Sequence, residues 1–258
     1  MDAGERTRFI GLALVAGDVT LKIDEPADEW REIDRWDGGV GWIAHPEEAL
    51  QRASHALVVD PDGQEPSGEQ DAPDGDVWVI DPVDAVGLDE FLADLGEVAG
   101  VTVLIDRHTR DAAEVATRHD VSVWLPEWMD DVEAEIDAPV ERFGETLPGS
   151  NYRVVPVVDN RFWQEAALFD GSTLVVPEAV GTTPYFLAGG RDLGVHPILR
   201  LRPPRNALGG LTPRRLLVGH GEGIDEGAAA TLQQALADAW RTAPRAYAGA
   251  VKDLLGRS

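Results

Sequence analysis

The chain has 258 residues, 43% of them hydrophobic, and it contains no cysteine. This length supports a sizeable core, and the lack of cysteine excludes disulfide bonds, thiolate metal sites and a cysteine nucleophile. Acidic residues number 47 against 22 basic ones, a net charge of −25, which argues against nucleic acid or an anionic membrane as a partner because both are polyanions.

The charge is spread through apolar-rich segments, and Lys22 and Lys252 are the only lysines. A lysine-poor, acidic surface suits a cytoplasm of molar salt, where the Debye length falls to roughly 3 Å and self-repulsion is screened. We therefore expect a halophilic protein, similar to those of salt-loving archaea. The sequence has neither an apolar run of transmembrane length nor an apolar signal core at its start, so we also expect a soluble, cytoplasmic protein.

The first part of the chain is predicted to consist mainly of strands. Turn residues and short apolar runs predict strands at residues 9–15, 19–23 and 56–59, a glycine-rich turn over 36–42 and a helix start at 46–50. Residues 61–76 are rich in Gly, Pro and acids and lack apolar periodicity. They are predicted to form an exposed loop.

In the central part, segments with the hydrophobic pattern of a strand alternate with segments that have the hydrophobic period of a helix. It predicts a strand at 77–80, a helix at 88–98, a strand at 101–105, a helix at 111–119 and a strand at 121–125. This order predicts parallel or mixed strand pairing with helices on the outside.

The last part begins with an irregular acidic stretch over residues 130–150. Strands are predicted at 152–158, 165–169, 173–176 and 215–218, with a hairpin turn at Asp170-Gly171, and helices at 227–241 and 245–255. No linker separates two independent cores, so a single domain over residues 1–258 is expected.

Three short motifs contain the residues whose side chains are suited to metal binding or catalysis. His108 and Asp111 lie in Leu-Ile-Asp-Arg-His-Thr-Arg-Asp-Ala (104–112), where a predicted strand leads into a helix. Glu178 follows the predicted strand in Thr-Leu-Val-Val-Pro-Glu-Ala (173–179), and His220 lies in the Gly-His-Gly of Leu-Leu-Val-Gly-His-Gly-Glu-Gly (216–223).

In order and spacing these motifs resemble the metallo-β-lactamase superfamily over roughly residues 9–242. That family carries a His-x-His-x-Asp-His loop after a strand, a later strand that ends in a bridging aspartate, and a Gly-His-Gly loop near its end. The resemblance implies an α/β fold, a four-layer αββα sandwich of two mixed sheets. It also implies a site where imidazoles and carboxylates hold zinc or iron.

The ligand pattern departs from the family. With Asp111 on the aspartate of the motif, its three histidine positions fall on Arg107, Thr109 and Ala112, and the bridging position falls on Glu178. Residues 158–166, where another histidine is expected, contain none. The remnant donors are Asp111, Glu178 and His220, with His108 adjacent but out of phase. We therefore expect a largely lost metal centre and no cofactor.

Two functions are consistent with these residues. The first is a non-catalytic protein that binds an unknown small molecule or protein over the former active site. The second is a metal-dependent hydrolase that uses zinc, iron or manganese at an atypical site built from the remnant donors. Structural roles also fit two of these donors, because Asp111 suits a helix N-cap and His220 suits a turn.

Arginines gather late in the chain within an otherwise acidic sequence. Their guanidinium groups are suited to bidentate binding of a carboxylate or phosphate, and ordinary pairing with surface acids is the alternative. We predict an anion-binding site at Arg200, Arg202 and Arg205.

Overall fold

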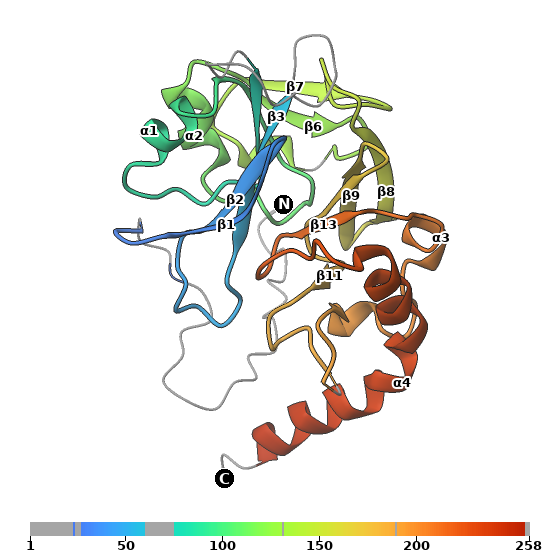
Figure 1. The fold of residues 1–258 in the computed structure, drawn as a ribbon. Helices are drawn as coiled ribbons and strands as arrows, with labels where there is room; N and C mark the ends of the chain where they lie inside the picture. Colours follow the sequence, from blue (N-terminus) through green and yellow to red (C-terminus); the bar gives the residue numbers. More distant parts are fainter. Residues whose placement is uncertain (1–22, 24–26, 60–74, 131, 189, 256–258) are drawn as a thin grey trace, which may run out of the picture.

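The structure is a computed structural model that describes residues 23, 27–59, 75–130, 132–188 and 190–255 (Figure 1). The strand predicted at 9–15 lies outside the described residues, as does the strand at 19–23 except for Ile23. Most of the loop predicted at 61–76 also lies outside them. None of the helices in the described part of the chain is both long and apolar enough to cross a membrane.

The first sheet has seven strands in chain order. They are β1 (Arg31–Trp36), β2 (Gly39–Ile43), β3 (Ala53–Val59), β4 (Asp76–Ile80), β5 (Glu97–Thr102), β6 (Val123–Pro126) and β7 (Val140–Phe143). Pairing is antiparallel from β1 to β4 and parallel from β4 to β7. The parallel pairs need crossover connections, and helices α1 (Leu88–Ala93) and α2 (Ala112–Arg118) provide the first two.

The second sheet has the strand order β13-β10-β9-β8. Its strands are β8 (Arg153–Asn160), β9 (Trp163–Phe169), β10 (Thr173–Val176) and β13 (Arg215–Val218). Strands β9 and β10 form the predicted hairpin, and β10 pairs with β13 in parallel. A smaller sheet joins β11 (Val180–Gly181) to β12 (Gly194–Val195). The remaining α-helices of the described residues are α3 (Arg205–Leu208) and α4 (Ala228–Leu255), and two short 3-10 helices are η1 (Glu133–Glu135) and η2 (Pro197–Leu199).

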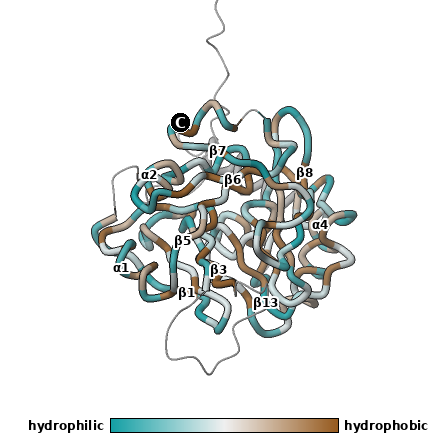
Figure 2. The backbone as a smooth tube through the Cα atoms, turned by 90° about the horizontal axis from the view of Figure 1, so that it is seen from above, coloured by the Kyte–Doolittle hydropathy of each residue, from teal (hydrophilic) through white to brown (hydrophobic). Residues whose placement is uncertain are grey.

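Side-chain alternation on β10 explains the layers. Val175 belongs to the core that includes the first sheet, whereas Leu174 and Val176 pack in the core that includes Leu232 and Leu236 of α4. Successive strand residues face opposite sides of a sheet, so β10 separates two apolar layers. Viewed from above, hydrophobic segments run through the interior, with α1 and α2 on one side and α4 on the other (Figure 2). The predicted four-layer αββα arrangement is confirmed.

Several element boundaries differ from the predictions in the first half. The helix predicted at 88–98 ends at Ala93, and β5 begins at Glu97 rather than 101. Gly96 between them has φ +153°, and a Cβ there would lie 2.2 Å from the Gly75 carbonyl oxygen, so the chain turns at this glycine. The predicted turn at 36–42 is the hairpin between β1 and β2, and no helix forms at 46–50.

Two further elements differ in the second half. Residues 130–150 are not wholly irregular, because β7 joins the edge of the first sheet there. The two helices predicted at 227–241 and 245–255 form the single helix α4, which continues through Pro244.

Candidate metal centre

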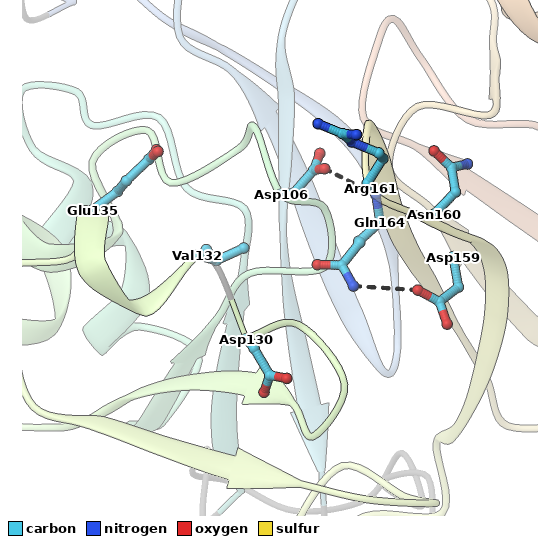
Figure 3. A pocket seen from close by; sticks show the side chains of 8 residues that line it. All are labelled: Asp106, Asp130, Val132, Glu135, Asp159, Asn160, Arg161 and Gln164. Carbon is cyan, nitrogen blue, oxygen red and sulfur yellow. Dashed lines mark hydrogen bonds between the residues drawn. The ribbon is translucent and has the colours of Figure 1, made fainter. Parts of the chain in front are cut away.

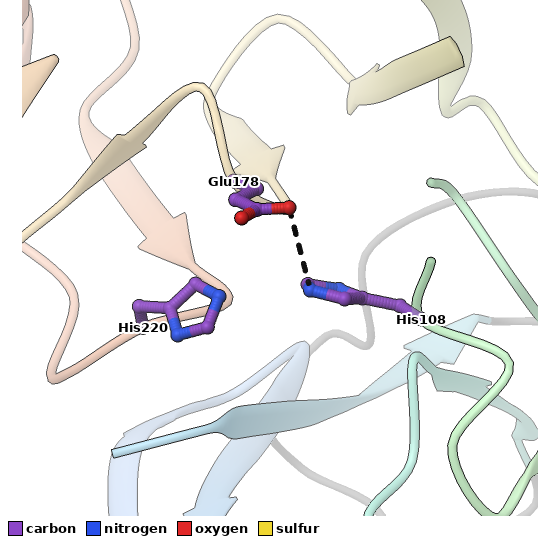
Figure 4. Close-up of side chains that lie close together, drawn as sticks. All are labelled: His108, Glu178 and His220. Carbon is purple, nitrogen blue, oxygen red and sulfur yellow. Dashed lines mark ion pairs between the residues drawn. The ribbon is translucent and has the colours of Figure 1, made fainter. Parts of the chain in front are cut away.

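Three side chains from separate strand ends converge between the two sheets. His108 lies between β5 and α2, Glu178 follows β10, and His220 follows β13 (Figure 4). One possible ligand atom from each residue lies within 4.8 Å of the others. Two imidazoles and a carboxylate form a donor set that proteins use to hold transition metals.

The backbone brings these strand ends close together. A Cβ atom on residue 219 would lie 2.2 Å from the carbonyl oxygen of Pro177, so glycine allows the chain after β13 to contact the chain after β10. The Ala53 N–H, at the start of β3, donates to the Gly219 carbonyl at 2.9 Å and joins the loop to the first sheet. His220 and Glu178 are thereby held by contacts between main-chain atoms.

His220 is oriented as a neutral ligand. Its Nδ1 lies 3.0 Å from the Leu50 carbonyl oxygen, which can only accept, so Nδ1 carries the proton and Nε2 carries the lone pair. The Nε2 atom is buried and has no hydrogen-bond partner among the described residues. Burial, followed by the electrostatic effect of the neighbouring His108 and Arg110 side chains, holds the pKa of His220 well below its usual value.

Glu178 faces basic groups through both of its carboxylate oxygens. Its Oε1 lies 3.5 Å from Nε2 of His196, and its Oε2 lies 3.6 Å from Nε of Arg107 and 3.8 Å from Nε2 of His108. Burial raises the pKa of Glu178 to about 6, although Arg107 and Arg110 oppose this change. Oε2 is buried without a hydrogen bond to any described residue, so it is available to a cation.

Glu165, inside β9, holds the segment that carries Glu178. Its Oε1 accepts hydrogen bonds from the main-chain N–H groups of Glu178 at 2.9 Å and Ala179 at 2.8 Å, and its Oε2 accepts one from Trp163 Nε1 at 2.8 Å. The predictions assigned no role to Glu165. The signal for it was an acidic residue directly before the apolar run of residues 166–169, since a buried carboxylate needs partners.

We expect Glu165 to make the metal-free protein less stable as the pH rises above neutrality. Burial raises the pKa of Glu165 to about 8, against the effect of its three N–H donors. The folded state therefore holds a proton that the unfolded chain releases above about pH 4.5, and rising pH favours unfolding until the folded pKa is passed. Stability from this group is fully present below the unfolded pKa and lost as the pH rises through about 8.

Unfolded histidines titrate near pH 6.5 and are mostly neutral above about pH 7, so the loss between about pH 7 and 8.5 comes mainly from Glu165 and should reach roughly 1 kcal/mol. Urea unfolding with EDTA, at about 2 M KCl to screen the surface charges, measures it. The control is Glu165→Gln, which cannot ionise and should show little slope in this pH range. Equal slopes for the two proteins would contradict the prediction.

His108 and Asp81 meet at the ends of β5 and β4. Asp81 Oδ1 accepts a hydrogen bond from the Leu104 N–H at 3.0 Å, and its Oδ2 lies 3.5 Å from Nδ1 of His108. Burial raises the pKa of Asp81 to about 6, and the charge of Arg110 opposes that rise. A carboxylate behind an imidazole orients the ring, as in many metal sites.

Not all predicted remnant donors reach the centre. His108, Glu178 and His220 come together, whereas the Asp111 carboxylate is turned away and accepts a hydrogen bond from the Asp84 N–H at 2.7 Å. Asp111 does occupy the N-cap position of α2, but its side chain forms no capping bond. Arg107, which stands at one of the histidine positions of the family motif, lies beside Glu178, with its Nε 3.6 Å from Oε2.

None of the predicted anion-binding arginines belongs to the group of three converging donors. Arg200 is 1% exposed and donates to the Val195 and Phe186 carbonyls. Arg205 donates to the Leu236 carbonyl on α4, and Arg202 is exposed. The guanidinium groups of Arg200 and Arg205 are therefore engaged with the main chain, and anion binding there stays a prediction.

A pocket of about 350 Å³ lies beside Asp106, two residues before His108 (Figure 3). Four of its eight lining residues are acidic, and only Arg161 is basic. This acidic lining favours neutral or cationic groups over an anion. The eight residues are Asp106, Asp130, Val132, Glu135, Asp159, Asn160, Arg161 and Gln164.

Comparison with known proteins relates the fold to solved structures. No protein-family model matches the chain, and no curated protein matches it in sequence. TMB-1 matches with a TM-score of 0.53 and 14% identity, over 86% of this chain and all of that one. DIM-1 metallo-β-lactamase matches at 0.50 and 14%, over 83% of this chain. A putative diflavin flavoprotein from Nostoc sp. PCC 7120 matches at 0.56 and 14%, over 86%.

These likenesses establish a metallo-β-lactamase fold for the chain. The expectation that no cofactor binds is wrong, because His108, Glu178 and His220 form a group able to hold a metal ion, on a fold shared with a metallo-β-lactamase. The error came from taking His108 as out of phase with the motif.

Proposed function

We propose that the chain is a metal-dependent hydrolase. Its centre has fewer ligands than the family motif and holds a single ion through His108, Glu178 and His220. The convergence of these three residues carries the proposal. The buried Nε2 of His220 and Oε2 of Glu178, which form no hydrogen bond to the described residues, support it, because buried polar atoms without a hydrogen bond call for an explanation such as an ion. Two histidines and one glutamate are the protein ligands of several catalytic zinc sites, and a 2-His-1-carboxylate set also suits iron.

The motif is proposed to be degenerate in a specific sense. Arg107, Thr109 and Ala112 stand at the histidine positions of the family pattern and supply no usual metal ligand. The chain would therefore hold fewer ions than the full motif does.

A divalent ion at such a site polarises a substrate oxygen and makes water more acidic. The protein's own residues prepare the site for this chemistry. The Leu50 carbonyl fixes His220 in one tautomer, and Glu165 holds the main chain of Glu178. Arg107 stacks over the Trp163 ring at 4.2 Å and is partly exposed. Its guanidinium group is suited to stabilise negative charge that develops on a substrate.

A second function, ligand binding without catalysis, is favoured by one observation. The Arg110 guanidinium lies against His108, with its Nη2 3.3 Å from Nε2 of the ring. A fixed positive charge at this place weakens metal binding. In both cases we propose a small molecule as the ligand, because the charge of −25 disfavours nucleic acid.

Metal analysis tests the proposal. The protein is purified without chelators or a nickel column, incubated with zinc, iron(II) or manganese, desalted and measured by elemental mass spectrometry. We expect about one ion per chain, together with hydrolysis of at least one chromogenic ester, phosphodiester or lactam. Absence of bound metal would contradict the proposal, and metal binding without hydrolysis would favour the second function.

We also propose that the protein works in concentrated salt. Acidic residues exceed basic ones by 25, so many surface carboxylates have no basic partner. Between about 2 M and 0.1 M KCl the screening length grows from roughly 2 to 10 Å, and the thermal midpoint should fall by roughly 10 °C or more. Circular dichroism melts measure this change, with sucrose at low ionic strength as the control. An unchanged midpoint, or full rescue by sucrose, would contradict charge screening as the cause.

A further inference from the structure

Arg110 places a permanent positive charge at the inner side of the metal centre. Its Nη1 donates to the carbonyl oxygens of Asp81 at 2.7 Å and Ala53 at 2.9 Å. Its Nη2 lies 3.3 Å from Nε2 of His108 and 3.4 Å from the Gly219 carbonyl. The guanidinium group therefore joins both sheets at the point where the donors meet.

The contact with His108 has a defined direction. A guanidinium group has donors only, so Nε2 of His108 must accept, and the ring proton lies on Nδ1, which faces Asp81 Oδ2 at 3.5 Å. Of the two ring nitrogens, Nε2 is also the one that lies 3.8 Å from Oε2 of Glu178. The lone pair of His108 that faces Glu178 is thus already engaged by a cation.

The backbone around this contact is strained at Arg110 and at Asp81, which supports a functional position for the Arg110 side chain. Arg110 has φ +39° and Asp81 has φ +44°, a left-handed conformation that non-glycine residues rarely adopt. Such strain persists where the surrounding structure imposes it, and it clusters at functional sites. The left-handed turn lets Arg110, two residues beyond His108, direct its guanidinium group back to the histidine.

We propose that Arg110 is a built-in counter-cation that a metal ion must displace from His108, so that it sets the metal affinity of the centre. The inference rests on the proposed function, since it concerns the same three ligands. The guanidinium group balances the carboxylates of Asp81 and Glu178 when the site holds no ion. A divalent ion brings like charge into a poorly screened site, and it competes with Arg110 for the same lone pair.

The test compares zinc affinity in four proteins: wild type, Arg110→Gln, Arg110→Lys and Arg118→Gln. Affinity is measured by competition with a chromophoric chelator, and stoichiometry by native mass spectrometry. Arg118→Gln removes an arginine from the outer face of α2, where it pairs with Asp84 and Asp89. We expect Arg110→Gln to bind zinc at least ~10-fold more tightly than wild type, and Arg110→Lys and Arg118→Gln to stay within about threefold of it.

The outcomes separate this inference from the proposed function. Equal affinity in wild type and Arg110→Gln would overturn the inference and leave the metal centre intact. Zinc binding by Arg110→Gln alone would support the inference and contradict a metal centre in the natural chain. No binding by either protein would overturn both.

The Arg110 side chain joins three segments of the chain, so the Arg110→Gln variant can fail to fold. A measurement on the wild-type protein keeps the test decisive in that case. The Arg110 Nε–Hε NMR signal, assigned with the help of Arg110→Lys, is followed during a zinc titration. A saturable shift is expected because the guanidinium group loses its contact with His108. An Nε–Hε signal that stays unchanged while zinc binds would overturn the inference.

Discussion

Replacing His220 with alanine is expected to reduce metal affinity by more than about 100-fold, because the change removes one of three ligands and even outer-shell changes cost 10–100-fold. The remaining pair, His108 and Glu178, cannot hold a divalent ion against water and Arg110. Metal content after desalting and the dissociation constant from chelator competition measure the effect. Hydrolysis should disappear in parallel if the proposed function is correct.

The matched control for this experiment is His119→Ala. His119 caps the end of α2 and pairs with Asp89 outside the centre, so its loss should leave metal binding unchanged. His220→Ala also loses the hydrogen bond to Leu50 at a cost of roughly 1–3 kcal/mol, and circular dichroism must show that the variant is folded. A folded His220→Ala protein with wild-type affinity would exclude His220 as a ligand.

Replacing Trp42 with alanine is expected to destabilise the protein by about 3–5 kcal/mol, as a large cavity forms in the core. Trp42 lies on β2 and is 0% exposed. Its Nε1 donates to the Val83 carbonyl at 2.9 Å, and its ring meets the Phe91 ring edge-on at 6.4 Å. The change would therefore remove packing between the first sheet and α1 and also orphan a buried carbonyl. Urea unfolding at about 2 M KCl measures the free energy of unfolding.

Trp240→Ala provides the comparison for Trp42. Trp240 lies on α4 and is 56% exposed, so its removal should change the free energy of unfolding by less than ~0.5 kcal/mol. Similar losses of unfolding free energy at the two positions would contradict the expected effect of burial at Trp42.

The strands of the second sheet were predictable because their pattern is local. β10 and β13 begin and end at the predicted residues 173–176 and 215–218, and Asp170-Gly171 forms the predicted hairpin. The helix predicted at 88–98 was too long, because a continuous apolar period concealed the turn at Gly96. Apolar periodicity indicates the type of an element better than its end, which a single backbone conformation can decide.

The candidate site was predicted in part. His108, Glu178 and His220 were all singled out, but the family spacing placed Asp111 on the aspartate of the motif and His108 outside it. In the structure the Asp111 carboxylate turns to Asp84, and His108 faces Glu178. Arg110 and Glu165 were not expected to act there, because their roles depend on which side of a turn or strand each side chain faces.

The sequence by itself determined the type of most strands and helices and the acidic character of the protein, whereas the four-layer arrangement was implied by the family resemblance. Alternation within strands and periodicity within helices are set by neighbours in the chain, and net charge is a simple count. Only the tertiary structure decided that three distant residues share one site and that Arg110 lies among them. The physical reason is that strand ends meet through contacts between sheets, such as the approach of Gly219 to Pro177, and a local pattern contains no information about them.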